Sequence, residues 1–179
     1  MSVSNADIVA ALKRNDVRDI DDSKLTRALY STDASLYRVV PQVVVRPRDI
    51  DEVHAALAAC AQTGTPLTSR GAGTSIAGNA IGTGVVLDFS KHLSKVLAID
   101  PTTSTAQVEP GVVHARLQAA AKPSGLRYGP DPSTHTRCTV GGMIGNNACG
   151  NRALGYGRSA DNIAALDLLT VGGERLQVG

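Results

Sequence analysis

The sequence predicts an α+β fold, because a strand–helix–strand unit is followed by antiparallel strands. A short β-branched strand at 43–45 and a strand at 67–69 flank an amphipathic helix at 49–62, and together they make a parallel, right-handed β-α-β unit. Two later strands, at 95–99 and 105–108, are separated by a short turn and read as a hairpin. This order predicts a small parallel β-α-β subdomain, and after it a mixed or antiparallel sheet subdomain with helices.

The remaining elements follow from caps, turns and apolar spacing. Helices are expected at 5–14 with Asn5 as the cap, at 21–29 and at 113–121, and strands at 85–89 and 163–171, the last followed by a Gly172-Gly173 turn and a short return strand at 175–178.

Composition narrows the functional class. The 179 residues carry 18 Lys and Arg against 16 Asp and Glu, a net charge of +2, and only 3% are aromatic. That balance argues against a nucleic-acid partner, which would need a basic surface and stacking side chains. The three cysteines are spaced neither as a disulfide framework nor as a metal site, so no metal is expected. With no signal-peptide pattern at the amino terminus, we expect a cytoplasmic protein.

Glycine distribution is the most informative feature of the chain. None of the 18 glycines lies in the first 63 residues, whereas five lie in 71–84 and six in 141–157. Glycine permits positive φ and close approach to the main chain. Two such clusters suggest two loops that converge on one elongated ligand, and ordinary turn chemistry is the alternative.

The first cluster has three interpretations as a phosphate-binding loop. A P-loop would need Lys and Ser or Thr where Asn79 and Ala80 stand, so it is excluded. A Rossmann fingerprint is disfavoured, because Gly78, Gly82 and Gly84 interrupt the helix that it requires. The favoured interpretation is a nest of backbone N–H groups from residues 71–75. A glycine-rich turn with an exposed arginine remains the alternative.

In that nest, Thr74 and Ser75 would add hydroxyl donors and Arg70 a positive charge suited to a diphosphate. In the second cluster, Gly141-Gly142 would open a helix over 143–148 whose amino terminus faces negative charge. Asn146 and Asn147 would supply amide donors and acceptors to a heteroaromatic ring, or would merely end that helix.

Four other side chains have a structural explanation. Asp131 stands between prolines, as turn-forming residues do. His114 and His135 are expected at the surface, and Cys149 is expected to fill space rather than to act as a nucleophile. We therefore assign no catalytic residue.

Four ordered motifs resemble one known family. The strand–helix–strand unit, SRGAGTSIAGNA, VEPGVV and GPDPSTHTRCTVGGMIGNNACGNRALGYGRSADNI are similar to the FAD-linked oxidases with a vanillyl-alcohol-oxidase/PCMH-type FAD-binding domain. The pattern is most similar to the D-lactate dehydrogenase and glycolate oxidase FAD-subunit group. The resemblance covers residue 41 to the end, and YSTDAS at 30–35 resembles versions fused to an iron–sulfur domain. It implies an amino-terminal helical extension at 1–40 and a PCMH-type domain at 41–179, incomplete at its carboxyl end.

The resemblance implies non-covalent FAD, because Thr74 stands where some relatives carry a flavin-linked histidine. The cofactor-binding residues that it implies are Arg70, Gly71, Ala72, Gly73, Thr74, Ser75, Gly78, Asn79, Pro110, Gly111, Val112, Pro130, Asp131, Pro132, Ser133, Thr139, Gly141, Gly142, Gly145, Asn146, Asn147, Ala148, Gly150, Gly155, Tyr156, Gly157, Asp161 and Ile163.

The function implied by the resemblance is oxidation of a 2-hydroxy acid, of D-lactate or glycolate type, by hydride transfer to flavin. The alternatives are a non-catalytic FAD-binding fragment, a sugar or aldonolactone oxidase of the same family, and an NAD-binding protein that uses the same glycines. Implied partners are an iron–sulfur domain or subunit and a quinone or cytochrome acceptor. Such an acceptor would place the protein in the cytoplasm, peripheral to the inner face of the membrane.

Overall fold

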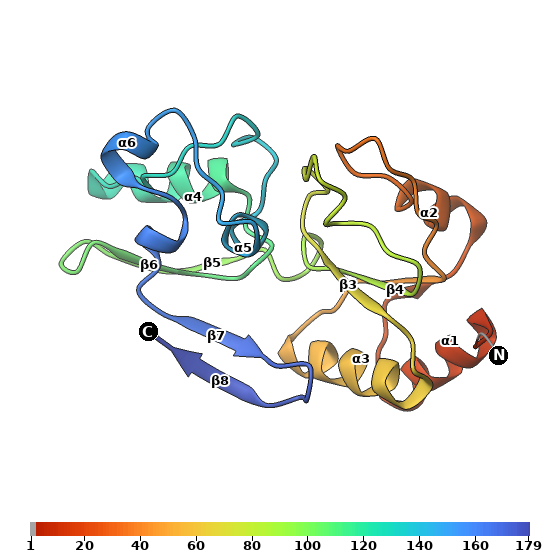
Figure 1. Ribbon diagram of the computed structural model, residues 1–179. Helices are drawn as coiled ribbons and strands as arrows, with labels where there is room; N and C mark the ends of the chain where they lie inside the picture. The colour runs from red at the N-terminus through yellow and green to blue at the C-terminus, as the bar shows by residue number, and fades with distance from the viewer. Residues whose placement is uncertain (1–2) are drawn as a thin grey trace.

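The computed structural model describes residues 3–179 and shows two lobes, with a carboxyl-terminal hairpin beneath them (Figure 1). In chain order the elements are α1 (Asn5–Arg14), β1 (Ile20–Asp21), α2 (Lys24–Leu29), β2 (Val43–Val45), α3 (Ile50–Thr63), β3 (Leu67–Arg70), β4 (Val85–Asp88), β5 (Val96–Asp100), β6 (Thr105–Val108), α4 (His114–Ala121), η1 (Lys122–Ser124), α5 (Val140–Gly145), α6 (Ala153–Tyr156), η2 (Ala160–Asn162), β7 (Leu166–Leu169) and β8 (Arg175–Val178). The predicted α+β class is confirmed.

The first lobe is built on a four-stranded sheet of order β1-β2-β4-β3. Strands β2 and β3 are parallel as predicted, but β4 lies between them and pairs with both, so Val85 faces Val43 on one side and Leu67 on the other. The β-α-β unit therefore skips one strand position. Residues 85–87 are fully buried, which suits a central parallel strand covered on both faces.

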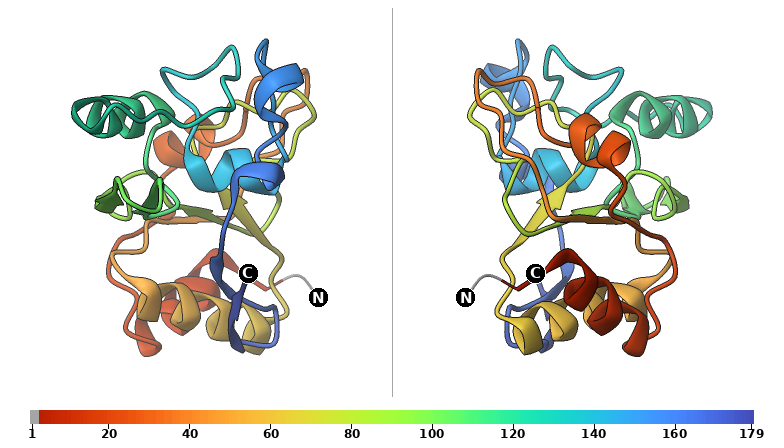
Figure 2. Two further views of the ribbon diagram at one scale, coloured as in Figure 1. Left: turned by 90° about the vertical axis from the view of Figure 1, so that its left-hand side faces the viewer. Right: turned by 90° about the vertical axis from the view of Figure 1, so that its right-hand side faces the viewer.

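Helices α1 and α3 cover one face of this sheet, and the loops and α2 lie on the other (Figure 2). Asp49 caps α3 by accepting a hydrogen bond from the Glu52 N–H at 2.9 Å, and Gly64 ends it with φ of 63°. The buried face is lined by small residues such as Ala56 and Ala59, so the helix approaches the sheet closely.

The predicted start of α2 and the predicted cap of α1 are wrong, and the caps seen in the structure explain both, whereas α1 has its predicted bounds. The helix expected over 21–29 begins at Lys24, because Ser23 caps it while Asp21 lies in β1, antiparallel to β2. The cap of α1 is Ser4, whose hydroxyl accepts a hydrogen bond from the Asp7 N–H, and Asn5 is the first helical residue.

The amino-terminal segment shares the core of the first lobe. Ile8, Leu12 and Val17 are buried in the same cluster as the strand residues 43–45 and the inner face of α3. Residues 1–2 of the extension expected at 1–40 lie outside the described residues. No helix within residues 3–179 has the length and apolar character needed to cross a membrane.

The second lobe combines the antiparallel β5–β6 hairpin with α4 and α5. Its core is small: Val112, Leu117 and Val140 are buried, and Val96 and Tyr128 pack around them. The strand expected over 163–171 is shortened to β7, which pairs along its length with β8.

The terminal hairpin returns to the first lobe. Leu169 packs against the first core, and a Cβ on Gly173 would lie 3.0 Å from the ring of His54 on α3. This contact joins the β7–β8 turn to α3 (Figure 1).

An ion-pair cluster joins the amino-terminal segment to the sheet. Asp19 lies 3.2 Å from Arg46, 2.7 Å from Lys91 and 2.8 Å from His92, and its side chain is 15% exposed. Burial alone would raise the pKa of Asp19, but the hydrogen bonds from Lys91, His92 and Arg46 outweigh it and lower the pKa to about 2.

This cluster predicts an acid-sensitive contribution to stability. Because the folded-state pKa lies below that of the unfolded chain, the contribution is present above about pH 4 and is lost as pH falls toward 2. Asp19→Asn should lower the free energy of unfolding at pH 7 by about 2 kcal/mol, and its difference from the wild type should shrink through that window. Urea unfolding at several pH values measures this; a difference that does not depend on pH would contradict it.

Candidate functional site

The first glycine cluster forms an open loop at the carboxyl end of β3. The backbone N–H groups of residues 71–76 donate to no group within residues 3–179. Gly73 and Gly78 have φ of 65° and 80°, the left-handed region that favours glycine. Ala72 is exposed on the same turn. The loop thus presents a run of unpaired donors at the edge of a parallel sheet where ligands of α/β proteins bind.

The side chains of Ser75 and Arg70 hold the main chain of this loop in shape. The Ser75 hydroxyl accepts hydrogen bonds from the N–H groups of Ala77 and Asn79, at 3.2 and 3.3 Å, which shapes the second half of the loop. Thr74 is half-buried beside it. The Arg70 guanidinium packs against Gly73 of this loop, and its Nη1 donates to the backbone carbonyls of Thr32 and Ala80.

The two glycine clusters meet, as the sequence predicted. A Cβ on Gly71 would overlap Oγ1 of Thr139, the residue that opens the second cluster. Farther along, the Asn79 amide lies 3.4 Å from Oδ1 of Asn146. Residues 67 positions apart in the sequence therefore line one site.

The helix in the second cluster begins three residues earlier than predicted and has the predicted length of six residues. It is α5, not a helix over 143–148, and the Thr139 hydroxyl caps it by accepting from the N–H of Gly142, which lies inside it. Asn146 is the C-cap and Asn147 has φ of 46°, so both end the helix. Oδ1 of Asn147 accepts a hydrogen bond from the Ala160 N–H and is committed to the backbone, whereas Asn146 faces the first loop.

The Pro110-Gly111-Val112 segment forms the seam between the lobes. The Gly111 N–H donates to the carbonyl of Leu93 at 2.7 Å, and a Cβ there would overlap the carbonyl of Phe89. Val112 and Pro110 accept hydrogen bonds from the N–H groups of Val140 and Gly141, each at 2.8 Å. The start of α5 is thereby fixed against the seam.

The segment Pro130–Ser133 packs on the far side of the second cluster. A Cβ on Gly150 would overlap the Asp131 carbonyl, and the Asp131 carboxylate accepts from the Arg152 N–H and pairs with its guanidinium, each at 3.1 Å. Asp131 is therefore a loop anchor, consistent with its interpretation as a turn former.

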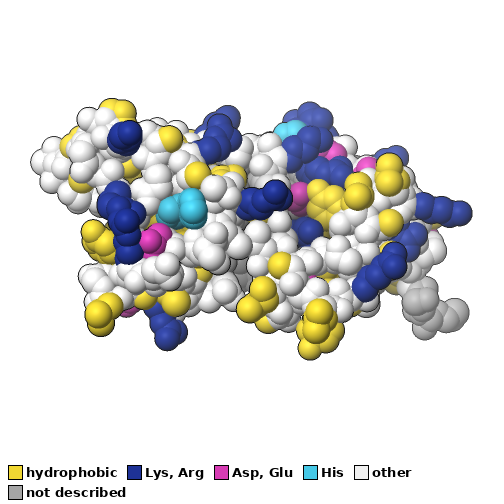
Figure 3. Space-filling view, turned by 90° about the horizontal axis from the view of Figure 1, so that it is seen from above, with side chains coloured by type: hydrophobic (Ala, Val, Ile, Leu, Met, Phe, Trp, Pro, Cys, Tyr) yellow, Lys and Arg dark blue, Asp and Glu magenta, His cyan; other side chains and the backbone are white. Residues whose placement is uncertain are grey.

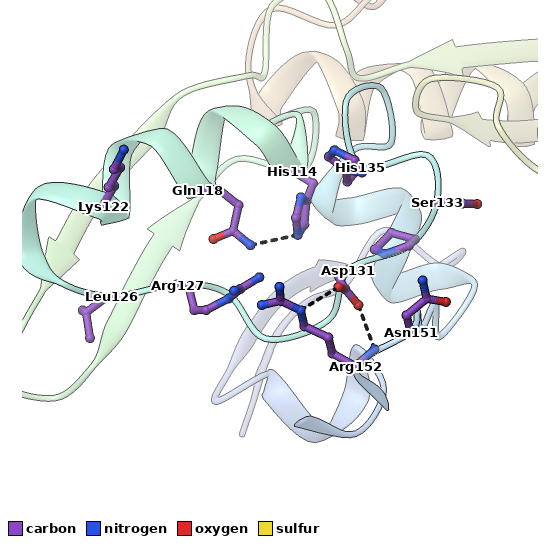
Figure 4. Close-up of a pocket in the computed structure, with 11 residues that line it drawn as sticks. His114, Gln118, Lys122, Leu126, Arg127, Asp131, Ser133, His135, Asn151 and Arg152 are labelled. Carbon is purple, nitrogen blue, oxygen red and sulfur yellow. Dashed lines mark hydrogen bonds and ion pairs between the residues drawn. The ribbon is translucent and has the colours of Figure 1, made fainter. Parts of the chain in front are cut away.

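A cleft of about 570 Å³ opens between α4 and this segment (Figure 4). Its lining is mostly polar and basic: His114, Gln118, Lys122, Leu126, Arg127, Asp131, Pro132, Ser133, His135, Asn151 and Arg152. Asp131 points toward Arg152 across one side of the cleft (Figure 4).

His114 is not a surface residue, contrary to the sequence prediction. It is 2% exposed, and its Nε2 lies 2.8 Å from the Pro130 carbonyl. Burial lowers the pKa of His114, and its Nδ1 has no hydrogen-bond partner among the described residues. His135 is exposed, as predicted. The hydrogen bond to Pro130 explains what the isolated sequence could not: α4 holds the 130–133 segment.

The last of the predicted cofactor-binding residues lie between 145 and 163, at the end of the second cluster and just after it. Gly157 has φ of 74°, and Asp161 accepts a hydrogen bond from the Arg158 N–H beside it. Ala148 accepts from the backbone N–H and the hydroxyl of Ser159. Tyr156 packs on Gly129 and Ile163 is half-buried, whereas Gly145 and Gly155 have open space around them.

Sequence reasoning missed Tyr30 and Asp33, which contact the first loop from the amino-terminal segment. The Asp33 carboxylate accepts from the Ala80 N–H at 3.3 Å, and the Tyr30 ring lies 5.1 Å from the Arg70 guanidinium carbon. The YSTDAS motif was the signal that could have found them. Among the described residues no group of three or more His, Cys, Asp or Glu side chains is arranged to hold a metal ion.

Comparison with known proteins identifies a family and several relatives. A family model described as an FAD binding domain matches residues 41–179. The glycolate oxidase subunit GlcD of Bacillus subtilis is 37% identical over 164 residues, covering 90% of this chain and 35% of that protein. The D-2-hydroxyglutarate dehydrogenase of Pseudomonas putida is 35% identical over 179 residues, covering 98% of this chain and 18% of that protein. The chain therefore spans about a third or less of the length of these relatives.

Among solved structures, an alkyldihydroxyacetonephosphate synthase superposes with a TM-score of 0.84 at 23% identity. The match covers 97% of this chain and 35% of that one. At this identity the likeness concerns the fold, and it includes both lobes and the seam between them.

The contact between the two clusters predicts a cost for any side chain at residue 71. Gly71→Ala should lower the free energy of unfolding by about 1–3 kcal/mol, because its Cβ overlaps a Thr139 hydroxyl that is 1% exposed. Gly145→Ala, with nothing within 4 Å, is the matched control. Removing the Thr139 side chain as well should cost less than the sum of the two single changes. Equal denaturation midpoints for the two alanine variants would contradict this.

Proposed function

We propose, from the premise that this chain belongs to the FAD binding domain family, that it is the FAD-binding portion of an oxidoreductase that oxidises a 2-hydroxy acid. Its fold is of the PCMH type and FAD is its cofactor. The observation that carries the proposal is the junction of the two glycine clusters, where Gly71 meets Thr139 and Asn79 meets Asn146.

The residues at this junction fit FAD. The unpaired N–H groups of 71–76 suit an anion with several acceptor oxygens, as a pyrophosphate is. The Cβ positions of Gly71 and Gly73 are occupied by the Thr139 hydroxyl and the Arg70 guanidinium, so only glycine allows the main chain to pack this closely here. Asn146, next to that loop, has amide groups able to donate to and accept from a flavin or adenine ring.

We extend this assignment along the second cluster and its neighbours. Backbone at Pro110–Val112 and 139–142 would line the cofactor beyond the pyrophosphate, since both belong to the seam facing the first loop. The segments 130–133 and 145–163 would complete the site. Thr74 stands where covalently flavinylated relatives have histidine, so FAD would be held without a covalent bond.

When bound, FAD supplies a two-electron acceptor, which is what conversion of a 2-hydroxy acid to a 2-oxo acid requires. The residues of the first loop and of the second cluster would bind and orient it. The names of the relatives support a substrate with a hydroxyl next to a carboxylate, glycolate in one and D-2-hydroxyglutarate in the other. We propose glycolate or D-lactate as the substrate type.

We also propose that electrons leave through a further subunit or domain. The relatives named GlcD in Bacillus subtilis and Escherichia coli are described as subunits of glycolate oxidase. An iron–sulfur domain or subunit passing electrons to a quinone or cytochrome would fill this role, at the inner face of the membrane.

A substitution in the first loop tests the cofactor site. Gly73→Val should weaken FAD binding by roughly tenfold or more, since a branched side chain is strained at positive φ and its Cβ would overlap the Arg70 guanidinium. Flavin fluorescence quenching on titration with FAD measures this, with NAD as competitor. Gly172→Ala, in the distant hairpin turn, is the control. A wild-type chain that stays colourless in excess FAD, or that NAD saturates instead, would contradict the proposal.

Substrate class is tested by following the yellow absorption of the FAD-loaded protein under anaerobic conditions. Bleaching by glycolate, D-lactate or D-2-hydroxyglutarate, but not by aldoses or aldonolactones, is the expected result for the protein with its downstream domains. Bleaching by sugars alone would assign it to the other branch of flavin oxidases. Bleaching by none would leave a binding module.

A further inference from the structure

One aromatic side chain touches the carboxyl ends of three neighbouring parallel strands. The Tyr30 hydroxyl donates to Asp88, the last residue of β4, at 2.5 Å. Its ring lies 5.1 Å from the guanidinium carbon of Arg70, which ends β3, and 5.4 Å from that of Arg46, which follows β2. Tyr30 thus sits at the sheet edge from which the first loop departs.

Arg70 bonds to main-chain carbonyls through Nη1, and the rest of its guanidinium packs against Gly73 of the first loop. Its Nη1 donates to the carbonyls of Thr32 and Ala80, each at 3.0 Å. Ala80 ends the first loop, and Thr32 follows Tyr30 by two residues. A single guanidinium therefore fastens the end of the loop to the amino-terminal segment, while the Tyr30 ring packs against it.

Two more contacts join the same partners. The Asp33 carboxylate accepts a hydrogen bond from the Ala80 N–H at 3.3 Å, and a Cβ on Gly78 would lie 2.9 Å from the Tyr37 ring. We call residues 30–37 the strap. It contacts the loop at its origin, at Gly78 and at its end, but leaves the N–H groups of 71–76 uncovered. On the face seen from above, basic side chains are more prominent than acidic ones (Figure 3).

We infer that the strap is a positioning element for the cofactor loop, and that Arg70 clamps this loop through Thr32, Ala80 and Tyr30 rather than binding the FAD pyrophosphate. This inference rests on the proposed function. The N–H groups of 71–76 make no hydrogen bond that would fix their orientation, so contacts at the start and end of the loop restrict the conformations that it can adopt. Groups held in place before binding lose less entropy when the ligand arrives.

The first test removes strap contacts one at a time. Tyr30→Leu and Asp33→Ala should each weaken FAD binding about tenfold, the scale expected for losing an interaction with a charged group. Tyr30→Phe keeps the ring against Arg70 and should fall between the wild type and Tyr30→Leu. Leu36→Ala, on the same segment but fully exposed, is the matched control and should bind as the wild type does.

Amide hydrogen exchange within the loop reports on the loop separately from the overall stability of the protein. In the FAD-free Tyr30→Leu and Asp33→Ala variants, amide hydrogen exchange at residues 71–79 should accelerate, while exchange in β2 and β4 stays at the wild-type rate. Faster exchange spread over the whole sheet, or an unchanged rate in the loop, would overturn the inference.

Salt dependence separates a clamp from a phosphate ligand. Arg70→Met should weaken FAD binding by the same factor at low and high ionic strength if the guanidinium acts on the backbone, and Arg70→Lys should restore part of it. The Arg70→Met and Tyr30→Leu effects should be less than additive. A loss that fades as salt rises would make Arg70 a direct ligand and overturn the clamp assignment.

Failure of this inference is distinct from failure of the proposed function. If the wild type does not bind FAD, the proposed function is wrong. If the wild type binds FAD and all strap variants bind equally well, only the inference is wrong.

Discussion

The arrangement of this protein depends on main-chain contacts that only glycine permits. Where the two lobes meet, Gly71 lies against Thr139 and Gly111 against the carbonyl of Phe89, with no room for a Cβ at either glycine. These contacts place the first loop beside the start of α5. Backbone at such close range supplies N–H groups instead of side chains, which is the surface that a phosphate-bearing cofactor requires.

The parallel sheet explains why the loop lies where it does. Strands β2, β3 and β4 all run toward one edge, and the segments that leave these strands gather there. At the same edge, the charged residues that end or follow these strands lie around Tyr30; they are Arg46, Arg70 and Asp88. A buried face of α1 and α3 supports the sheet from the other side, so the edge stays fixed while the loop above it remains open to a ligand.

Several features of the site could be predicted from the sequence because they depend on local backbone chemistry. The glycine clusters, the absence of a P-loop lysine and the end of α3 at Gly64 are all properties of short segments. Other predictions were wrong because a distant partner decided the outcome. His114 is buried because the Pro130 carbonyl accepts its hydrogen bond, and α5 begins at Val140 because Thr139 caps it.

The sequence by itself determined the α+β class, most of the helices and strands, and the two loops whose composition suits a phosphate-bearing cofactor. Spacing and turn residues act over a few positions, so they can be interpreted without the rest of the chain. Only the tertiary structure decided that β4 enters between β2 and β3, that Gly71 packs on Thr139, and that Arg70 donates to Thr32 and Ala80. These depend on groups far apart in the sequence, whose approach is governed by packing of the whole core and is not encoded in any one segment.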